Sequence, residues 1–313
     1  DDQWTQVPEL DPGSPAAQLQ RIRARLADGD WDRVEFLATR WIETNPGHPL
    51  TPEAYLLRGD ALFGRGDQYD ALFDYEYLVR AFPGSDAFGR ALEREYRIAC
   101  NFLAGRKRKI LGLRIASAVE EAEELLIRVQ ERLPGSRLAE QAAITLADHY
   151  FAQRRMNLAA EMYAIFLRNH PRSVDVPKAR KRLIAANLAG FAGPEFDASG
   201  LIEARTRIED LVADDPASVA DLDTNAILIR IEESLAEKQL RTARWYARSG
   251  DLISAERVLR RLIRDRPRTA AAAEGARFAL SLMERLPERV RRQAAPYREL
   301  LGLEPPAEVD DAR

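Results

Sequence analysis

The sequence predicts an all-α array of about six helical hairpins that ends in a C-terminal capping helix. Two observations support this prediction. Prolines recur at intervals of 37 to 51 residues, and fixed positions before each proline carry small or apolar residues. The prolines are Pro46, Pro83, Pro134, Pro171, Pro216 and Pro267. We find no strand pattern of any length, so we expect helices throughout.

The positions before each proline describe the second helix of a hairpin. A small residue or valine stands twelve residues before the proline, and apolar residues stand eight and five residues before it. The small residue allows close approach to the first helix, and the proline ends the second helix. The small residues are Val34, Ala71, Ala122, Ala159, Ala204 and Ala255. Gly29, Gly66 and Gly250 lie seventeen residues before three of the prolines, where they permit the turn between the helices.

The array is predicted to span residues 16–286, between a flexible leader at 1–15 and a partly disordered tail at 287–313. The stretch at 190–197 contains glycines and a proline. It leaves two alternatives open, one continuous array or two arcs hinged at this stretch. The segment AILIRIEESLAEKQLRTARWYA keeps helical periodicity, which predicts a lengthened helix before the last hairpin turn.

A hydroxyl residue follows two positions after four of the prolines. A hydroxyl side chain is a good N-cap for the next helix because it accepts a hydrogen bond from a free backbone N–H. We therefore expect helices to begin directly after these residues. They are Ser85, Ser136, Ser173 and Thr269.

Composition argues against several classes of function. The net charge of −3 gives no general attraction to nucleic acid. The three histidines, His48, His149 and His170, lack metal-ligand spacing, and Cys100 is the sole cysteine. The acidic run at 120–124 fits the solvated face of a helix better than an acid–base pair. We expect no metal, no cofactor and no enzymatic activity.

The period resembles the tetratricopeptide repeat over roughly residues 16 to 286. The stretch from Leu235 to Leu286 resembles the last repeat and terminal helix of the BamD-like outer-membrane protein assembly lipoproteins. The residues that carry this resemblance are Glu237, Ala243, Tyr246, Gly250, Ala255, Pro267 and Thr269. The pattern Pro-x-Ser/Thr followed by alanine is similar as well.

This resemblance implies a non-catalytic scaffold at the periplasmic face of the outer membrane. It also implies an N-terminal lipid on a cysteine that this chain does not contain. The implied partners are the barrel-bearing assembly subunit and unfolded outer-membrane proteins. The alternatives are a periplasmic or soluble, even cytoplasmic, adaptor of cell-envelope or division machinery and an accessory domain of an enzyme.

Candidate binding residues follow from the repeat register, because the first helix of each tetratricopeptide hairpin lines the concave groove. They are Arg23, Asp60, Phe63, Tyr96, Asp148, Phe151, Arg244 and Arg248. Aromatic rings flanked by charges suit a peptide that ends in a carboxylate. The alternative is that the aromatic rings only fill space between helices. Residues 240–300 carry 15 arginines and 7 acids, which could dock on an acidic partner or simply cover apolar surface.

A second candidate surface is the basic insertion of the third hairpin. It contains Arg106, Lys107, Arg108, Lys109 and Arg114, with apolar residues between them. Two alternatives stay open for this stretch. Its apolar part packs back on the array, or its charges contact anionic lipid or an acidic partner.

Overall fold

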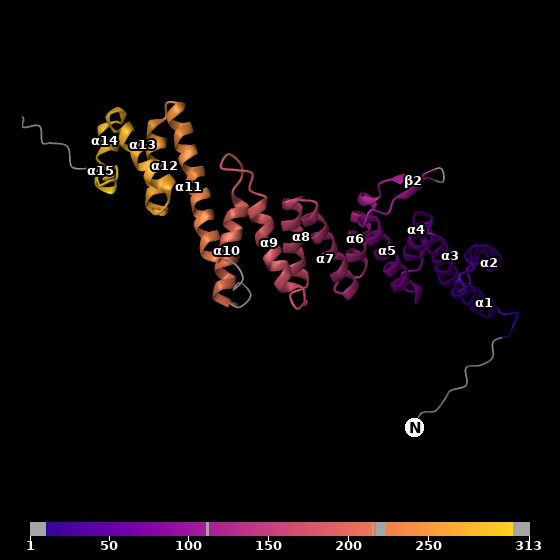
Figure 1. Ribbon diagram of the computed structural model, residues 1–313. Helices are drawn as coiled ribbons and strands as arrows, with labels where there is room; N and C mark the ends of the chain where they lie inside the picture. The colour runs from indigo at the N-terminus through magenta and orange to yellow at the C-terminus, as the bar shows by residue number, and fades with distance from the viewer. Residues whose placement is uncertain (1–10, 111–112, 215, 217–222, 303–313) are drawn as a thin grey trace, which may run out of the picture. The chain divides into compact units, whose positions relative to one another are not determined.

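The computed structural model describes residues 11–110, 113–214, 216 and 223–302. These residues fold into consecutive helical hairpins that belong to two compact units (Figure 1). Unit 1 consists of residues 1–149 and 168–173, and unit 2 consists of residues 150–167 and 174–313.

Unit 1 contains the first three hairpins. Their helices are α1 (Pro15–Ala27) with α2 (Trp31–Thr44), α3 (Thr51–Arg65) with α4 (Gln68–Ala81), and α5 (Ala87–Leu103) with α6 (Val119–Arg132). The helices of a fourth hairpin, α7 (Arg137–Ala152) and α8 (Met156–Asn169), contribute to both units. Trp41 of α2 is buried in the first core, and its indole N–H donates to the Pro15 carbonyl oxygen at 3.1 Å. That bond fixes the start of α1.

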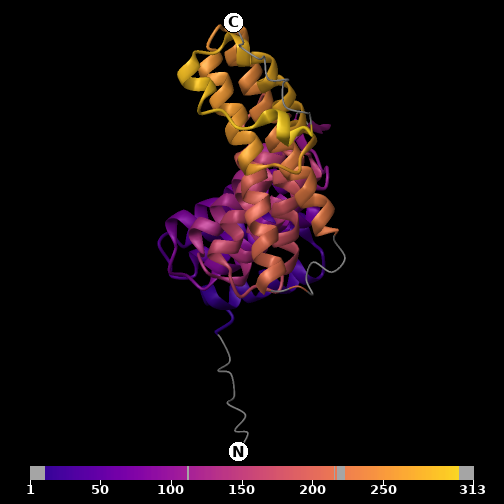
Figure 2. The same ribbon diagram turned by 90° about the vertical axis from the view of Figure 1, so that its left-hand side faces the viewer.

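Unit 2 contains the last two hairpins and the capping helix. Their helices are α9 (Val176–Ala189) with α10 (Ser199–Asp214), α11 (Thr224–Arg248) with α12 (Leu252–Asp265), and the cap α13 (Ala270–Leu282). α11, α12 and α13 lie side by side in both views (Figures 1 and 2) and share one apolar core. The described residues therefore form six hairpins and a cap, which confirms the predicted fold class.

The repeat positions account for the burial. All six small residues twelve positions before the prolines have no exposed surface. The apolar residues eight and five positions before the prolines are at most 5% exposed. The long helix before the last turn is confirmed, because α11 runs for 25 residues without interruption.

The predicted turn glycines adopt the conformation that requires glycine. Gly29, Gly66 and Gly250 have φ angles of 78°, 90° and 87°, in the left-handed region. The fourth hairpin has Arg154 at the same register position, with a φ of 57°. Arg154 is the one non-glycine residue among the described residues with a positive φ. A side chain at such a φ costs about 1–2 kcal/mol, so the fourth turn is a strained version of the others.

The N-cap prediction is confirmed at two of its four positions. Thr269 Oγ1 accepts from the N–H of Ala272 at 3.2 Å, and Ser136 Oγ accepts from the N–H of Ala139 at 3.0 Å. At Ser85 and Ser173 the prediction is wrong. Both hydroxyls donate instead, to the Phe82 carbonyl oxygen and to Glu140, and the next helices begin two or three residues later.

The basic insertion contains strands, which corrects the expectation of helices throughout. β1 (Arg108–Ile110) pairs antiparallel with β2 (Leu113–Ala116) (Figure 1). The register is irregular between Arg108 and Lys109. Ile110 pairs with Leu113, and residues 111 and 112 lie outside the described residues. Strands of three and four residues are too short for an alternating pattern to be recognised in the sequence.

The segment after residue 286 contains further helices. Two short helices, α14 (Glu288–Arg291) and α15 (Tyr297–Leu300), follow the 3-10 helix η2 (Met283–Arg285). Tyr297 is buried in the core of the last hairpin, and its hydroxyl donates to Glu256 at 2.8 Å. The part of the expected tail that the structure describes thus contains two short helices, and partial disorder of the tail stays a prediction. Residues 1–10 and 303–313 lie outside the described residues.

The stretch at 190–197 lies within unit 2, whereas the units divide near residues 149 and 168–173. The hinge at this stretch stays a prediction. None of the helices in the described part of the chain combines the length and the hydropathy that a bilayer crossing needs.

Candidate functional site

The charged candidates Arg23 and Asp60 contact other side chains of unit 1. Arg23 forms an ion pair with Glu53 of α3. Asp60 accepts from the Tyr75 hydroxyl at 2.7 Å and from Arg94 at 2.7 Å. These contacts are made between helices, so they stabilise the hairpins.

The aromatic candidates of unit 1 are partly buried. The Arg97 guanidinium lies over the Phe63 ring, 5.4 Å from its centroid. The Tyr96 hydroxyl is 3.2 Å from Thr145 Oγ1, and burial raises the pKa of Tyr96. These rings contact neighbouring helices of their own unit.

The two candidates of α7 fall on either side of the division between the units. Asp148 belongs to unit 1 and is half-buried. Phe151 belongs to unit 2, where the Arg182 guanidinium lies 5.4 Å from its ring centroid and the Tyr163 ring meets it edge-on.

Arg244 and Arg248 lie at a basic groove of unit 2. The groove has a volume of about 890 Å³ and is formed by α11, α13, η2 and the loop before α10. Its lining residues are Pro194, Glu195, Lys238, Arg241, Thr242, Arg244, Trp245, Ala247, Arg248, Phe278, Leu282 and Arg285. We call this cavity the basic groove.

The spacing of residues on α11 explains why the basic side chains meet. Lys238, Arg241, Trp245 and Arg248 are three or four residues apart, so they lie on one face of the helix. These residues belong to the C-terminal half of α11, directly before the turn to α12. The helical spacing therefore supplies the surface.

The loop wall of the groove is held by the same helix. The Lys238 ammonium donates to the carbonyl oxygens of Phe196 and, at 3.4 Å, of Pro194. Arg241 forms an ion pair with Glu195. These contacts tie the stretch at 190–197 to α11.

Two of the groove cations, Arg248 and Arg285, have guanidinium groups that are free to bind a ligand. Arg244 is paired with Glu274 of α13. Among the described residues, Arg248 and Arg285 have neither an ion-pair nor a hydrogen-bond partner for their guanidinium groups. A free guanidinium presents a planar pair of donors that fits a carboxylate. The groove can therefore bind an acidic ligand without first breaking a contact at these positions.

An exposed aromatic ring completes the site. Trp245 is 57% exposed, and its ring meets the Tyr246 ring edge-on at a centroid distance of 5.0 Å. Tryptophan and arginine are the residues that most often carry the binding energy of protein interfaces. Phe278 and Leu282 extend the apolar area beside it. The arrangement suits a peptide or protein surface with carboxylates next to apolar side chains.

The sequence interpretation missed most of this site. It identified Arg244 and Arg248 but not Lys238, Arg241, Trp245 or Arg285. The helical spacing of the basic residues on the predicted long helix could have found the first three. Arg285 could not be assigned from the sequence, because its position depends on how η2 follows the cap.

The basic insertion of unit 1 is a different kind of feature. Arg106 and Lys107 are exposed and precede β1, while Arg108, Lys109 and Arg114 belong to the paired strands. A lipid or acidic-partner contact for these five residues stays a prediction. Within residues 11–110, 113–214, 216 and 223–302 there is no group of three acidic, histidine or cysteine side chains that could hold a metal ion.

One protein-family model matches the part of the chain that contains the basic groove. The family model described as YfiO, outer membrane lipoprotein, matches residues 115–296, more than half of the chain. The chain belongs to this family. The matched span includes every residue that lines the basic groove. The family and the hairpin fold describe a helical protein-interaction scaffold, and the family places related proteins in the outer membrane.

Solved structures of helical repeat proteins are similar over most of this lipoprotein-family chain. One is the C-terminal part of a TPR repeat-containing protein from Cytophaga hutchinsonii, with 14% identity, coverage of 84% of this chain and 87% of that chain, and a TM-score of 0.40. Another is a tetratricopeptide repeat protein from Parabacteroides merdae, with 13% identity, coverage of 92% and 97%, and a TM-score of 0.39. No curated protein sequence matches the chain.

Proposed function

We propose that this protein is a non-catalytic scaffold of outer-membrane β-barrel protein assembly. In this role it binds the barrel-bearing assembly subunit and segments of unfolded outer-membrane proteins. The observation that carries the proposal is the basic groove of unit 2, which lies within the span matched by the family of outer membrane lipoproteins.

The chemistry of the groove supports a protein ligand. Five cationic side chains and one acidic side chain line it, and an exposed indole stands among them. A small-molecule site is usually more enclosed and more apolar than this groove. The mixture of guanidinium groups, an indole and leucine or phenylalanine surface is typical of protein interfaces.

The charge of the groove selects the partner surface. An acidic segment gains charge-assisted hydrogen bonds from Arg248 and Arg285, whereas a basic segment is repelled. We therefore propose that the assembly subunit presents carboxylates to unit 2. Substrate segments that end in a carboxylate are a second class of ligand for the same groove.

Membrane attachment through an N-terminal lipid is part of the proposal. The family is one of outer membrane lipoproteins. A diacylated or triacylated cysteine ahead of Asp1 in the native protein would anchor it at the periplasmic face. The mass of the N-terminal peptide from fractionated cell envelopes tests this point, and an unmodified terminus in the soluble fraction would favour a soluble adaptor instead.

Charge reversal tests the role of the groove. The double variant Arg244→Glu, Arg248→Glu places two acids on the groove face of α11. We expect recovery of the barrel-bearing subunit in a pull-down to fall by about tenfold or more, because like charges then face each other across the interface. Unchanged recovery would contradict the assignment of this groove.

The matched control lies on the next helix. Arg257 and Arg261 of α12 are also exposed and four residues apart, but neither lines the groove. The double variant Arg257→Glu, Arg261→Glu changes the net charge by the same amount. It should leave recovery near that of the wild type. Equal losses in both double variants would indicate a general charge effect.

A further inference from the structure

Unit 1 carries a second groove, with a volume of about 520 Å³, whose chemistry differs from that of the basic groove. Residues of α4 and α6 form its walls, and Glu95 of α5 contributes to its floor. The lining residues are Tyr69, Leu72, Phe73, Glu76, Tyr77, Arg80, Ala81, Glu95, Glu121, Glu124, Leu125 and Arg128. We call this cavity the acidic groove.

Aromatic rings that the fold leaves in solvent form one wall. Phe73 is 65% exposed and Tyr77 is 48% exposed, although both belong to a helix with a well-buried opposite face. Tyr69 meets Phe73 edge-on at 5.7 Å, and Tyr77 packs against Tyr55 at 4.6 Å, so the rings are held in place. Large exposed rings of this kind mark interaction surfaces.

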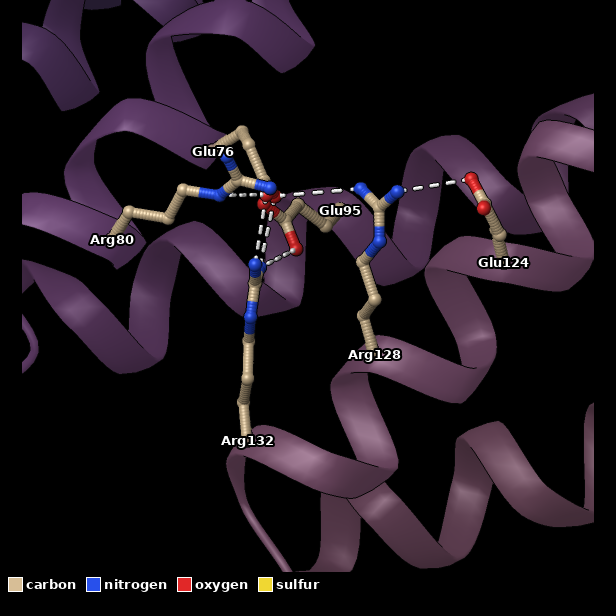
Figure 3. A network of polar contacts seen from close by, with 6 residues as sticks. All are labelled: Glu76, Arg80, Glu95, Glu124, Arg128 and Arg132. Atoms are coloured by element: carbon tan, nitrogen blue, oxygen red, sulfur yellow. Dashed lines mark hydrogen bonds and ion pairs between the residues drawn. The ribbon is translucent and has the colours of Figure 1, made fainter.

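The floor contains two carboxyl groups, those of Glu76 and Glu95, which Arg132 contacts unequally. Arg132 donates to both carboxylate oxygens of Glu76, at 2.8 and 2.9 Å, but approaches Glu95 Oε2 only to 3.3 Å (Figure 3). Glu95 has no exposed surface, and its Oε1 accepts no hydrogen bond from the described residues. Because Glu95 is fully buried, the carboxylate at the floor that a ligand can reach is that of Glu76, whose side chain is 21% exposed.

The groove contains more acidic than basic side chains. Its own arginines already pair with some of the glutamates. Four glutamates and two arginines line it. Arg80, which is 70% exposed, pairs with Glu76 at 2.6 Å, and Arg128 lies between Glu76 and Glu124 at 3.7 and 2.9 Å (Figure 3). An exposed ion pair such as that of Arg80 is weak. A guanidinium from outside can therefore replace it at little cost.

We propose that the acidic groove binds a segment of a partner protein through one arginine side chain. Its guanidinium would lie against the rings of Phe73 and Tyr77 and donate to the Glu76 carboxylate in place of Arg80. An apolar residue next to that arginine would cover the exposed edge of Phe73.

Arginine fits this groove better than the other side chains. Its planar group stacks on aromatic rings and at the same time donates to carboxylates in two directions. A lysine ammonium is more strongly hydrated and pairs with one oxygen at a time. An acidic ligand is disfavoured because the carboxylates of Glu76, Glu121 and Glu124 line the groove. This site is separate from the basic groove and does not depend on the role proposed for it.

Binding of a pair of peptides to the full chain tests the proposal. The probe is acetyl-Ala-Leu-Arg-Phe-Ala-amide with a fluorescent label, and its control has citrulline, a neutral analogue, in place of arginine. We expect the arginine peptide to bind at least about tenfold more tightly than the citrulline peptide, since only the arginine peptide carries the charge. Equal affinities, or no detectable binding of the arginine peptide, would overturn the proposal.

Two exposed positions give variants with opposite expected effects. Phe73→Ala removes the aromatic wall and should weaken binding of the arginine peptide about threefold or more. Arg80→Ala removes the internal competitor and should strengthen binding. Both side chains are mostly in solvent, so both variants should fold. A Phe73→Ala variant that binds like the wild type, or an Arg80→Ala variant that binds more weakly, would contradict the site.

A variant of unit 2 locates the peptide. The double variant Arg244→Glu, Arg248→Glu makes the basic groove more acidic but leaves the acidic groove unchanged. Affinity for the arginine peptide should stay at the wild-type value. A changed affinity would place the peptide in unit 2 and overturn the assignment to unit 1.

Discussion

In unit 2, α11 presents four basic residues and an indole to a groove, whereas in unit 1 the groove beside α4 is lined by glutamates and by phenylalanine and tyrosine rings. The hairpins of both units share the same buried positions. The difference lies in the solvent-facing positions, which the apolar pattern does not constrain. One repeat can therefore carry two grooves of opposite charge.

The charges on the first helices of the hairpins show the same contrast. In unit 1, Asp60 is held by Tyr75 and Arg94, so its charge serves the contact between helices. In unit 2, Arg248 is the last residue of α11 and has no ion-pair or hydrogen-bond partner among the described residues. The neighbouring side chains thus decide whether a charge stabilises the fold or remains for a ligand.

The largest expected difference between the units concerns glycines at close helix contacts. A Cβ atom at Gly59 of unit 1 would lie 2.6 Å from Cε1 of the buried Tyr75 ring, whereas one at Gly275 of unit 2 would lie 3.1 Å from the flexible end of Leu262. We expect Gly59→Ala to lower the free energy of unfolding by about 3 kcal/mol. Gly275→Ala should stay within about 1 kcal/mol, because alanine favours the helix. Urea denaturation of both variants measures this, and equal losses would contradict the contact geometry.

The second difference is a pH effect confined to unit 1. Burial and the charge of Glu76 raise the pKa of Glu95 to about 8. The folded state then binds a proton that the unfolded state loses, so stability falls as pH rises from about 4.5 to about 8, by at most roughly 1.4 kcal/mol per pH unit.

Glu95→Gln should remove this dependence, since glutamine does not titrate. Between pH 6 and pH 8 we expect the wild type to lose about 2 kcal/mol more unfolding free energy than the variant. Urea denaturation at both pH values measures the difference. Parallel pH profiles for the two proteins would show that the carboxyl group is already ionised in the folded state.

The third prediction concerns the end of unit 2. Glu256 is 1% exposed and accepts from the Tyr297 hydroxyl at 2.8 Å. Tyr297→Phe keeps the ring but removes the donor to a buried carboxyl group, and should cost about 1.5 kcal/mol of unfolding free energy. A Leu300→Ala variant, which changes an exposed side chain of the same short helix, is the control. No loss in Tyr297→Phe would mean that residues beyond 286 are not part of the folded core.

The smallest expected effects come from the hairpin turns and should have opposite signs. Gly250 has a φ of 87°, and no atom lies within 4 Å of the position that a Cβ atom would take there, so Gly250→Ala should destabilise by about 1 kcal/mol through the backbone alone. Arg154 occupies the equivalent turn at a φ of 57°. Arg154→Gly should leave stability unchanged or raise it by up to about 1 kcal/mol. Thermal unfolding compares them, and losses of the same sign would contradict the shared turn geometry.

The buried half of the repeat could be predicted from the sequence because packing demands small and apolar residues at fixed intervals. Ala159, Tyr163 and Phe166 are examples, all without exposed surface. The strands at 108–116 and the helices after residue 286 could not be predicted. Their stability depends on contacts with distant residues, such as that of Tyr297 with Glu256, rather than on local periodicity.

The binding residues were predictable to a smaller extent. The repeat register identifies which residues belong to the first helix of a hairpin, and it found Arg244 and Arg248. It does not show which charges are neutralised by neighbours, as at Arg23 and Asp60. The repeat register also cannot predict the state of Glu95, because that depends on whether Arg132 pairs with Glu76 or with Glu95.

Photo-crosslinking from the basic groove tests the central claim most directly. A photoreactive phenylalanine analogue in place of Trp245 should cross-link to the barrel-bearing assembly subunit in cell envelopes. The same analogue at Ile229, which is exposed on the same helix but does not line the groove, should give no such product. Cross-links of equal yield from both positions, or none to an assembly component from position 245, would contradict the account.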